Sequence, residues 1–338
     1  MTMKFSIRSY EACLPIIIYV TLLIWLGALP VSAYAQDRVK AAYDGTSGQQ
    51  APLWLATDLG LFKKYGVEGN PVLIMNAPVR MASLAANESQ FGVGAAIAPL
   101  TAALAGADSI IVATYHNKHL ASFAVSPDIR TPQDLKGKDI GVTSLGGATH
   151  LAAAIALKHW GIDERSVTIR PAGGSSDRLV SLLARRMTAT VLNEPYSQMA
   201  RKAGIPILLE LGELGEGFPT VSVVTTKKFL ATQRETVKQF LKGISEGVYI
   251  FRTDRERSLK SLAKWLRSND QELLDLTYRT HAKKMSFPPY TDLTGVQAVL
   301  DFLSRSRPEA KNRKAQEFVD EGILKELERE GFFSALQK

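Results

Sequence analysis

The stretch at residues 139–161, DIGVTSLGGATHLAAAIALKHWG, joins a short apolar run to a helix-like run through two adjacent glycines. The two runs predict a buried strand followed by a helix. Glycine lets the backbone approach another group closely, and the first amides of a helix attract anions because they lack partners within the helix. The alternative is a tight turn, capped by a hydroxyl, in which the glycines serve only the backbone. The candidate ligand-binding residues of this turn are Ser144, Gly146, Gly147, Ala148 and Thr149.

The same alternation of short apolar runs and helix-like runs extends from residue 38 to about residue 224. It predicts βα units and an α/β fold with mostly parallel sheets, in two sets that meet near residues 119–125. Because the helix-like runs after residue 224 cannot form an α/β lobe of their own, we expect them to pack on one of the two sets. We predict these helices at residues 233–251, 255–267, 271–284, 291–305 and 310–330. Two crossings of the chain between the sets would leave a ligand-binding cleft between two lobes.

The first 35 residues have the layout of a secretory signal peptide. A basic start precedes an apolar core at about residues 14–29 and the small-residue site Ala33-Tyr34-Ala35, so we predict cleavage before Gln36 and a periplasmic mature chain. The alternative is a retained membrane anchor, because the apolar core is long for a signal peptide. The only cysteine, Cys13, lies in this segment, so no internal disulfide is expected in the mature chain.

The formal net charge of the chain is +8, and acidic residues are mixed among the basic ones in the helix-like stretches. We interpret this charge as a solvated surface that is compatible with an anionic ligand, and we expect no nucleic-acid partner for an exported chain. Neither a GxGxxG nor a GxxxxGK[ST] motif occurs. Since no paired carboxylates or Ser, His and Asp arrangement supports catalysis, we predict no enzyme activity, no cofactor and no metal site.

Further candidate residues lie where other predicted strands end, which is the edge at which open α/β sheets bind ligands. Gln49 and Gln50 in TSGQQAP would donate amide hydrogen bonds into the cleft, unless they only form a polar loop. Gly94 and Ala95 in FGVGAAIAPL are small and would leave room for a ligand, or serve simple packing. Tyr115 follows a strand near the first crossing and would form the floor of the pocket.

Charged residues at two other strand ends leave alternatives open. Glu194 in VLNEPY would answer a cationic or amine group of a zwitterionic ligand, or it would cap the next helix or pair with Arg178. Arg80 would either clamp an anion or extend into solvent from the first turn of a helix. His116 and His119 in HNKH lie three residues apart, which is weak evidence for a metal without further ligands nearby.

Together these segments resemble the periplasmic substrate-binding proteins of ABC importers in the nitrate, sulfonate, taurine and thiamine-precursor group, the NMT1/THI5-like proteins. The resemblance covers nearly the whole chain after residue 35. It rests on GQQAPLWLATDLGLFKKYGVE, PLTAALAGAD, DLKGKDIGVTSLGGATHLAAAIALKHWGID, RPAGGSSDRLVSLLARRMTATVLNEPYSQMARKAG and the helices that follow. It implies a two-lobed, type II-like periplasmic-binding-protein fold that closes about a hinge. The implied lobes are residues 37–118 plus 223–338 and residues 123–218, with crossings at 119–122 and 219–222.

The resemblance also implies a monomer that captures a small polar ligand and delivers it to an inner-membrane permease with its ATPase. The expected ligand is a sulfonate-, nitrate- or carboxylate-like anion or a zwitterion, and a thiamine-precursor pyrimidine is the alternative. An enzyme or a sensor on the same fold also remains an alternative. The predicted export signal opposes an enzyme, as does the absence of the cysteine-rich motif found in the iron-dependent thiamine-precursor enzymes.

Overall fold

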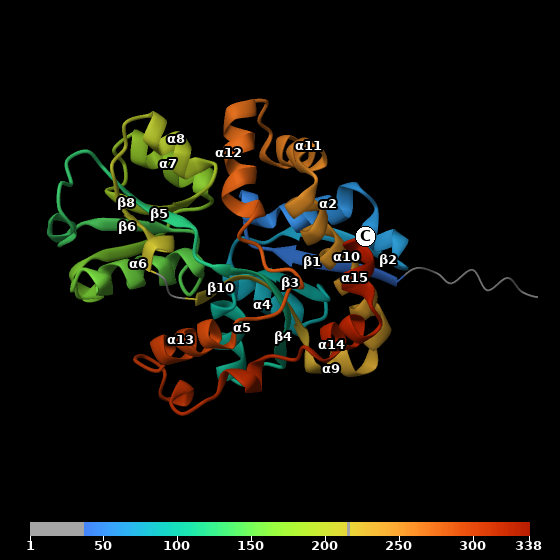
Figure 1. Cartoon of the computed structure of the whole chain (residues 1–338). Coiled ribbons are helices and arrows are strands. Elements are labelled where there is room, and N and C mark those ends of the chain that lie inside the picture. The colour runs from blue at the N-terminus through green and yellow to red at the C-terminus, as the bar shows by residue number, and fades with distance from the viewer. Residues whose placement is uncertain (1–36, 215–216) are drawn as a thin grey trace, which may run out of the picture. The chain divides into compact units, whose positions relative to one another are not determined.

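The computed structural model describes residues 37–214 and 217–338, and the predicted signal peptide lies outside them. The strands form two separate five-stranded sheets, and helices pack on both (Figure 1). This arrangement confirms the predicted α/β class. In the described part of the chain, no helix is both long enough and apolar enough to cross a membrane.

In the first sheet, the N-terminal strand of the described chain lies between the edge strand and the central strand. Across the sheet, the order is β2 (Val67–Leu73), β1 (Asp37–Tyr43), β3 (Phe91–Gly94), β10 (Gly217–Thr226) and β4 (Ser109–Lys118). Strand β1 is parallel to β2 and β3, whereas β10 runs antiparallel to both β3 and β4. The sheet is therefore mixed, and only its β10 strand departs from the predicted parallel arrangement.

The second sheet repeats this pattern with its own antiparallel strand. Its order is β7 (Thr168–Pro171), β6 (Asp139–Val142), β8 (Ala189–Asn193), β5 (Ala121–Val125) and β9 (Ile207–Glu210). Strand β6 is parallel to β7 and β8, and β5 is antiparallel to β8 and β9. Helix α6 (Ala148–His159) covers one face, and α7 (Ser175–Leu183) and α8 (Tyr196–Lys202) cover the other (Figure 1).

The two antiparallel strands are those by which the chain enters one sheet from the other. Only residues 119–120 separate β4 from β5, and the 3-10 turn η5 (Leu211–Leu214) precedes β10. The strand before each crossing, β4 or β9, ends at the same edge of its sheet as its parallel neighbours. The next strand, β5 or β10, therefore begins at the corresponding edge of the other sheet and runs antiparallel to the strands there. Residues 219–222, where we predicted the second crossing, lie inside β10, and Val221 and Ser222 of this range pair with β4 of the first sheet.

The remaining helices pack mainly on the first sheet. Those before the first crossing are α2 (Ala51–Asp58), α3 (Leu61–Lys64), α4 (Ala77–Ala85) and α5 (Ile97–Leu104). Those after β10 are α9 (Lys227–Thr232), α10 (Arg234–Thr253), α11 (Arg255–Leu266), α12 (Gln271–Ala282), α13 (Leu293–Leu303), α14 (Gly322–Arg329) and α15 (Phe332–Leu336). The bounds of α10 to α13 lie within two residues of the predicted ones.

The helix predicted at residues 310–330 is wrong over most of its length. The chain forms two short 3-10 turns, η6 (Pro308–Ala310) and η7 (Ala315–Phe318), and only α14 is an α-helix. Asn312 has a φ of +66°, which interrupts a helix, and Val319 forms a parallel bridge with Ile111 of β4. The amide of Asp320 donates to the carbonyl of Ile111 at 2.8 Å. This segment therefore extends the open edge of the first sheet instead of continuing the helical pattern.

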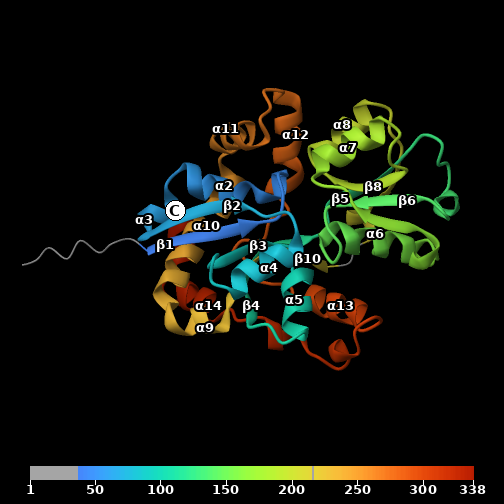
Figure 2. The same cartoon turned by 180° about the vertical axis from the view of Figure 1, so that it is seen from behind.

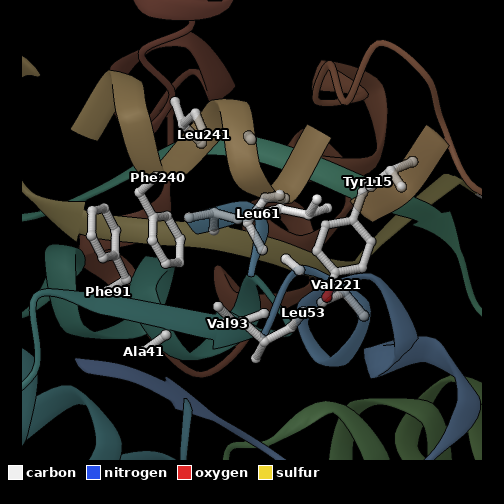
Figure 3. Packing of buried hydrophobic residues seen from close by; sticks show 14 of the residues in the cluster. Ala41, Leu53, Leu61, Phe91, Val93, Tyr115, Val221, Phe240 and Leu241 are labelled. Carbon is white, nitrogen blue, oxygen red and sulfur yellow. The ribbon is translucent and has the colours of Figure 1, made fainter. Parts of the chain in front are cut away.

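Aromatic side chains fix α10 to the first sheet. Phe240 of α10 stacks on Phe91 of β3 at 3.8 Å between ring centroids, and on Phe62 of α3 at 4.7 Å. Figure 3 shows Phe240 and Phe91 side by side, with Leu241 on the same helix. Each buried aromatic ring removes about 150–250 Å² from water. Burial of these rings therefore explains why the C-terminal helices pack against this sheet.

Candidate ligand-binding site

A small cavity of about 40 Å³ lies where loops from the two sheets meet. From the first sheet it is lined by the loop after β1 and by the segment between β2 and α4, and from the second by the starts of α6 and α7 and the end of β8. The predicted residues Gln49, Ser144, Gly147, Ala148 and Thr149 line it, whereas Gln50, Gly94, Ala95, Tyr115, Gly146 and Glu194 do not. The cavity thus gathers strand ends and helix starts, as expected for an α/β binding site.

The turn before α6 brings an uncapped helix start to this cavity. Gly147 is the N-cap residue and has no side chain with which to cap the helix. The amides of Ala148 and Thr149 are the first two of α6, and amides at these positions have no carbonyl partner within a helix. The hydroxyl of Thr149 accepts a hydrogen bond from the amide of Thr143 at 2.8 Å, which ties the helix start to the end of β6. The free amides and the positive end of the helix dipole favour an anion here.

Gly146 shapes the turn and does not face the cavity. Its φ is +71°, and its amide donates to Nδ1 of His150 at 2.9 Å. Nδ1 accepts a hydrogen bond only when it carries no proton, so the ring proton belongs on Nε2, which lies 3.0 Å from Oε1 of Glu164. His150 therefore holds the turn from within α6. The sequence analysis did not identify this histidine.

Replacing Gly146 with alanine is expected to weaken ligand binding about tenfold. A left-handed backbone costs an L-residue about 1–2 kcal/mol, and relaxation of that strain would shift the helix start. Gly161 at the other end of α6 is a matched control, because it has a φ of +69° and equally open surroundings but lies beyond the end of the helix that does not reach the cavity. Gly161→Ala should lose similar stability in thermal melts but keep its affinity in calorimetric titrations. Equal affinities of the two variants would show that the turn does not contribute to binding.

Arg80, in the first turn of α4, brings a fixed positive charge to the cavity. Its side chain is only 3% exposed, so the alternative of a solvated arginine is wrong. Nη1 donates to the carbonyl of Ile74 at 2.8 Å, which orients the guanidinium beside the end of β2. Burial lowers the pKa of Arg80 and the nearby Asp44 carboxylate raises it, but an arginine stays protonated near neutral pH.

Asp44 brings a carboxylate to the same cavity, and the sequence analysis missed it. It directly follows β1. Its Oδ1 accepts a hydrogen bond from Nε2 of Gln50 at 2.7 Å, and its Oδ2 accepts one from the amide of Ala95 at 3.2 Å. The available signal was a single acidic residue at the end of a predicted buried strand. The cavity lining therefore contains a positive charge on Arg80 and a negative charge on Asp44.

Four predicted residues that do not line the cavity instead hold Asp44 in place. Gln50 and Ala95 donate to its carboxylate, and the hydroxyl of Tyr115 donates to Oε1 of Gln50 at 3.3 Å. Gly94 is small for the same reason, because a Cβ atom there would collide with Oδ2 of Asp44. The space that we predicted for a ligand at Gly94 is thus occupied by the Asp44 carboxylate.

Glu194 does not face the cavity. Its carboxylate accepts hydrogen bonds from Nη1 of Arg201 at 3.3 Å and from the amide of Gln198 at 3.2 Å. Glu194 therefore caps α8, which was one of the predicted alternatives. Arg178 bonds instead to groups of β8 and of the loop after β6. The neighbouring Asn193 lines the cavity and supplies an amide there.

His116 lies behind the site, in contact with a second buried histidine. Its Nε2 is 3.2 Å from Nδ1 of His281 on α12, which packs against the turn η2 (Gly48–Gln50). Burial lowers the pKa of His116 and of His119 to about 4, and it also holds the pKa of His281 well below its ordinary value. Across residues 37–214 and 217–338, no three His, Cys, Asp or Glu side chains gather as metal ligands.

Solved structures of similar fold were found for this chain, although a search of curated proteins returned no match. A protein from Bordetella bronchiseptica RB50 has a TM-score of 0.79 and 17% identity, over 87% of this chain and 97% of that one. The alkanesulfonate-binding protein SsuA from Xanthomonas axonopodis pv. citri, bound to MOPS, has a TM-score of 0.69 and 19% identity, over 84% and 98%. The periplasmic nitrate-binding protein NrtA from Synechocystis PCC 6803 has a TM-score of 0.69 and 12% identity, over 88% and 89%.

At these identities the likeness establishes the fold alone. It confirms the prediction of the two-lobed α/β fold of periplasmic binding proteins. The sequence itself is more specific, because residues 47–256 match the family described as NMT1/THI5 like. The matched segment is more than half of the chain and contains most of the cavity lining, including Arg80 and the turn before α6. This chain belongs to the NMT1/THI5-like family.

Proposed function

We propose that this protein is an extracytoplasmic solute-binding protein that captures a small polar ligand and delivers it to an ABC permease. The ligand is a sulfonate-, nitrate- or carboxylate-like anion, or a zwitterion that carries such a group. The observation that supports this most directly is the buried guanidinium of Arg80, which lines the same cavity as the uncapped start of α6. Charged donors and helix starts both stabilise a bound oxyanion.

We further propose that the two sheets with their helices act as lobes that close on the ligand. The amide of Gly48 donates to the carbonyl of Glu194 at 3.2 Å, and the amide of Ala77 donates to the hydroxyl of Ser144 at 3.4 Å. Each bond joins an element of the first sheet to one of the second, so both must break for the cavity to open. Residues 119–120, between β4 and β5, form a crossing about which such a motion would turn.

The size of the cavity limits what the closed protein holds. One water molecule needs at least about 10–15 Å³ of cavity, so about 40 Å³ accommodates a group of a few heavy atoms. A nitrate ion or the head group of a carboxylate or sulfonate is of this size. A longer ligand would keep the lobes further apart than in this structure.

Asp44 is expected to favour ligands that carry an amine beside the acidic group. A simple anion meets repulsion from this carboxylate, whereas an ammonium group pairs with it. In Asp44→Asn, the preference for β-alanine over propionate, and for taurine over ethanesulfonate, is expected to fall about tenfold or more in calorimetric titrations. Asp163→Asn is the control, because Asp163 pairs with Arg165 on the surface and does not line the cavity. An unchanged preference in Asp44→Asn would contradict this role.

The proposed function is tested by identifying the ligand and its fate. Mass spectrometry of molecules released from the purified protein should find a small acid. Thermal shift assays over nitrate, alkanesulfonates, carboxylates, amino acids and pyrimidines should show saturable stabilisation by one class. The ligand should be recovered unchanged after incubation, since we propose binding without chemistry. Stabilisation by none of these classes, or conversion of the ligand, would overturn the proposal.

A further inference from the structure

A second cavity, of about 760 Å³, lies along the C-terminal half of α6. The first turn of α6 lines the small cavity described above, whereas Leu151, Ile155 and Lys158 of the same helix line the second one. The facing wall is α13, with Val299 and Phe302, and Figure 2 shows α13 below α6. Pockets that bind small molecules typically measure about 300–1,000 Å³, so this cavity has the size of a ligand site.

The interior walls of this second cavity are apolar. Leu151 and Val299 are buried, as is Phe218 at the start of β10, and Ile155 and Phe302 are half-buried. Apolar area removed from water contributes about 25 cal/mol per Å². An aromatic or hydrocarbon body of a ligand would therefore bind between α6 and α13.

Two cations at the mouth of the second cavity lack acidic partners. Lys158 and Arg305 are exposed, and both also line an adjoining groove of about 460 Å³. Neither side chain forms an ion pair with any residue in the described ranges; the Arg305 guanidinium lies only over the ring of Phe302, at 5.7 Å. Unpaired cations beside an apolar cavity are complementary to an acidic group on an apolar molecule.

The cavity also contains two carboxylates, which do not neutralise these cations. Asp301 accepts a hydrogen bond from Nε2 of Gln297 at 3.0 Å along α13. Glu213 belongs to η5, which forms a different wall from α6, which carries Lys158, and from the turn after α13, which carries Arg305. Neither carboxylate forms an ion pair with Lys158 or Arg305 in the described part of the chain.

His119 adds a buried polar group to the cavity wall. It is 6% exposed, and its ring nitrogens form no hydrogen bond of ordinary geometry among the described residues, although the carbonyl of Ala148 at the start of α6 lies near enough to interact with the ring. Its ring lies 4.9 Å from that of Phe218, between centroids. Buried polar atoms without partners are rare and costly in folded proteins. A polar atom of a ligand, or a water molecule that the ligand holds, would satisfy this histidine.

We propose that this second cavity is a ligand site for a small molecule with an apolar body and a carboxylate or similar acidic group. The body lies between α6 and α13, and the acidic group pairs with Lys158 and Arg305. The site is separate from the small cavity, and its two walls belong to the two proposed lobes.

The test is calorimetric titration of the purified protein with 4-phenylbutyrate and with its neutral counterpart 4-phenylbutyramide. Saturable binding is expected for the acid and at least tenfold weaker binding for the amide. The double variant Lys158→Glu/Arg305→Glu should bind the acid at least tenfold more weakly, with unchanged thermal melts because both side chains are exposed. No saturable binding to the wild type, or equal binding of acid and amide, would overturn the proposal.

Two further variants distinguish the cavities. Ala298→Trp places a large side chain in the second cavity from an exposed position of α13, and it should abolish binding of 4-phenylbutyrate. Arg80→Gln changes only the small cavity and should leave this binding intact. Loss of binding in Arg80→Gln with retention in Ala298→Trp would place the acid in the first cavity and refute the second site.

Discussion

Replacing Arg80 with glutamine is expected to weaken binding of the acidic ligand by at least about 100-fold. The guanidinium is the buried cation of the small cavity, and hydrogen bonds to charged groups contribute about 1.5–3 kcal/mol each. Loss of about 3 kcal/mol corresponds to slightly more than a factor of 100 in the dissociation constant. Glutamine keeps a donor near the Ile74 carbonyl and leaves no buried charge behind, so the fold should survive.

One further variant separates the charge of Arg80 from its shape, and another serves as a control. Arg80→Lys keeps the positive charge but loses the planar fork, so an intermediate loss of affinity is expected. Arg170→Gln is the control, because Arg170 pairs with Asp139 at 2.7 Å and lies outside the cavity. Calorimetric titration with the ligand that the screen identifies would measure all three variants. Wild-type affinity in a properly folded Arg80→Gln variant would exclude Arg80 from the site.

Acidification from pH 6.5 to pH 5 is expected to lower the free energy of unfolding by about 1–2 kcal/mol for each of His116 and His119, and burial of His281 acts in the same direction. Burial lowers the pKa of His116 and His119 from 6.5 to about 4, and that of His281 well below 6.5. Below pH 6.5 the unfolded chain therefore binds protons that the folded protein excludes, and stability falls by about 1.4 kcal/mol per pH unit for each such group. Because the folded pKa is lowered, this stability is present above pH 6.5 and is lost as the pH falls toward 4.

The window from pH 6.5 to pH 5 isolates the histidines from the carboxylates. Hydrogen bonds from Lys238 and Arg234 lower the pKa of Glu326 from 4.5 to about 2, so its contribution is lost only at more acidic pH. His116 and His281 share a hydrogen bond and are expected to titrate as a pair. His281 lies on α12, which packs against η2. Protonation of the histidine pair should therefore disturb η2 and weaken ligand binding in the same pH range.

Urea denaturation at pH 7.5, 6.5, 5.8 and 5.0 would measure this effect. His119→Asn should reduce the loss of stability across the window by about 1–2 kcal/mol, because the variant lacks a side chain that takes up a proton only when the chain unfolds. His159→Gln is the matched control, since His159 is exposed. A pH-independent free energy of unfolding between pH 6.5 and pH 5 would show that the three histidines do not stay neutral in the fold.

The sequence alone determined those features that depend on neighbouring residues. Apolar periodicity placed the strands and helices, and the bounds of α10 to α13 came within two residues of the prediction. The glycine pair before α6 indicated a helix start at a strand end, and that start does line the cavity. Such signals are local because a helix or strand exposes and buries residues at a fixed spacing.

Only the tertiary structure decided which side chains share the cavity. Asp44 and Gly94 are 50 residues apart, and the reason for the glycine is visible only when the carboxylate occupies its space. Arg80 is buried because the segment after β2 packs against loops of the second sheet. Glu194 lies outside the cavity because its carboxylate pairs with Arg201 of α8. The directions of β5 and β10 likewise follow from where the chain crosses between sheets. Burial and long-range pairing arise from the packing of distant segments, which no local pattern of residues encodes.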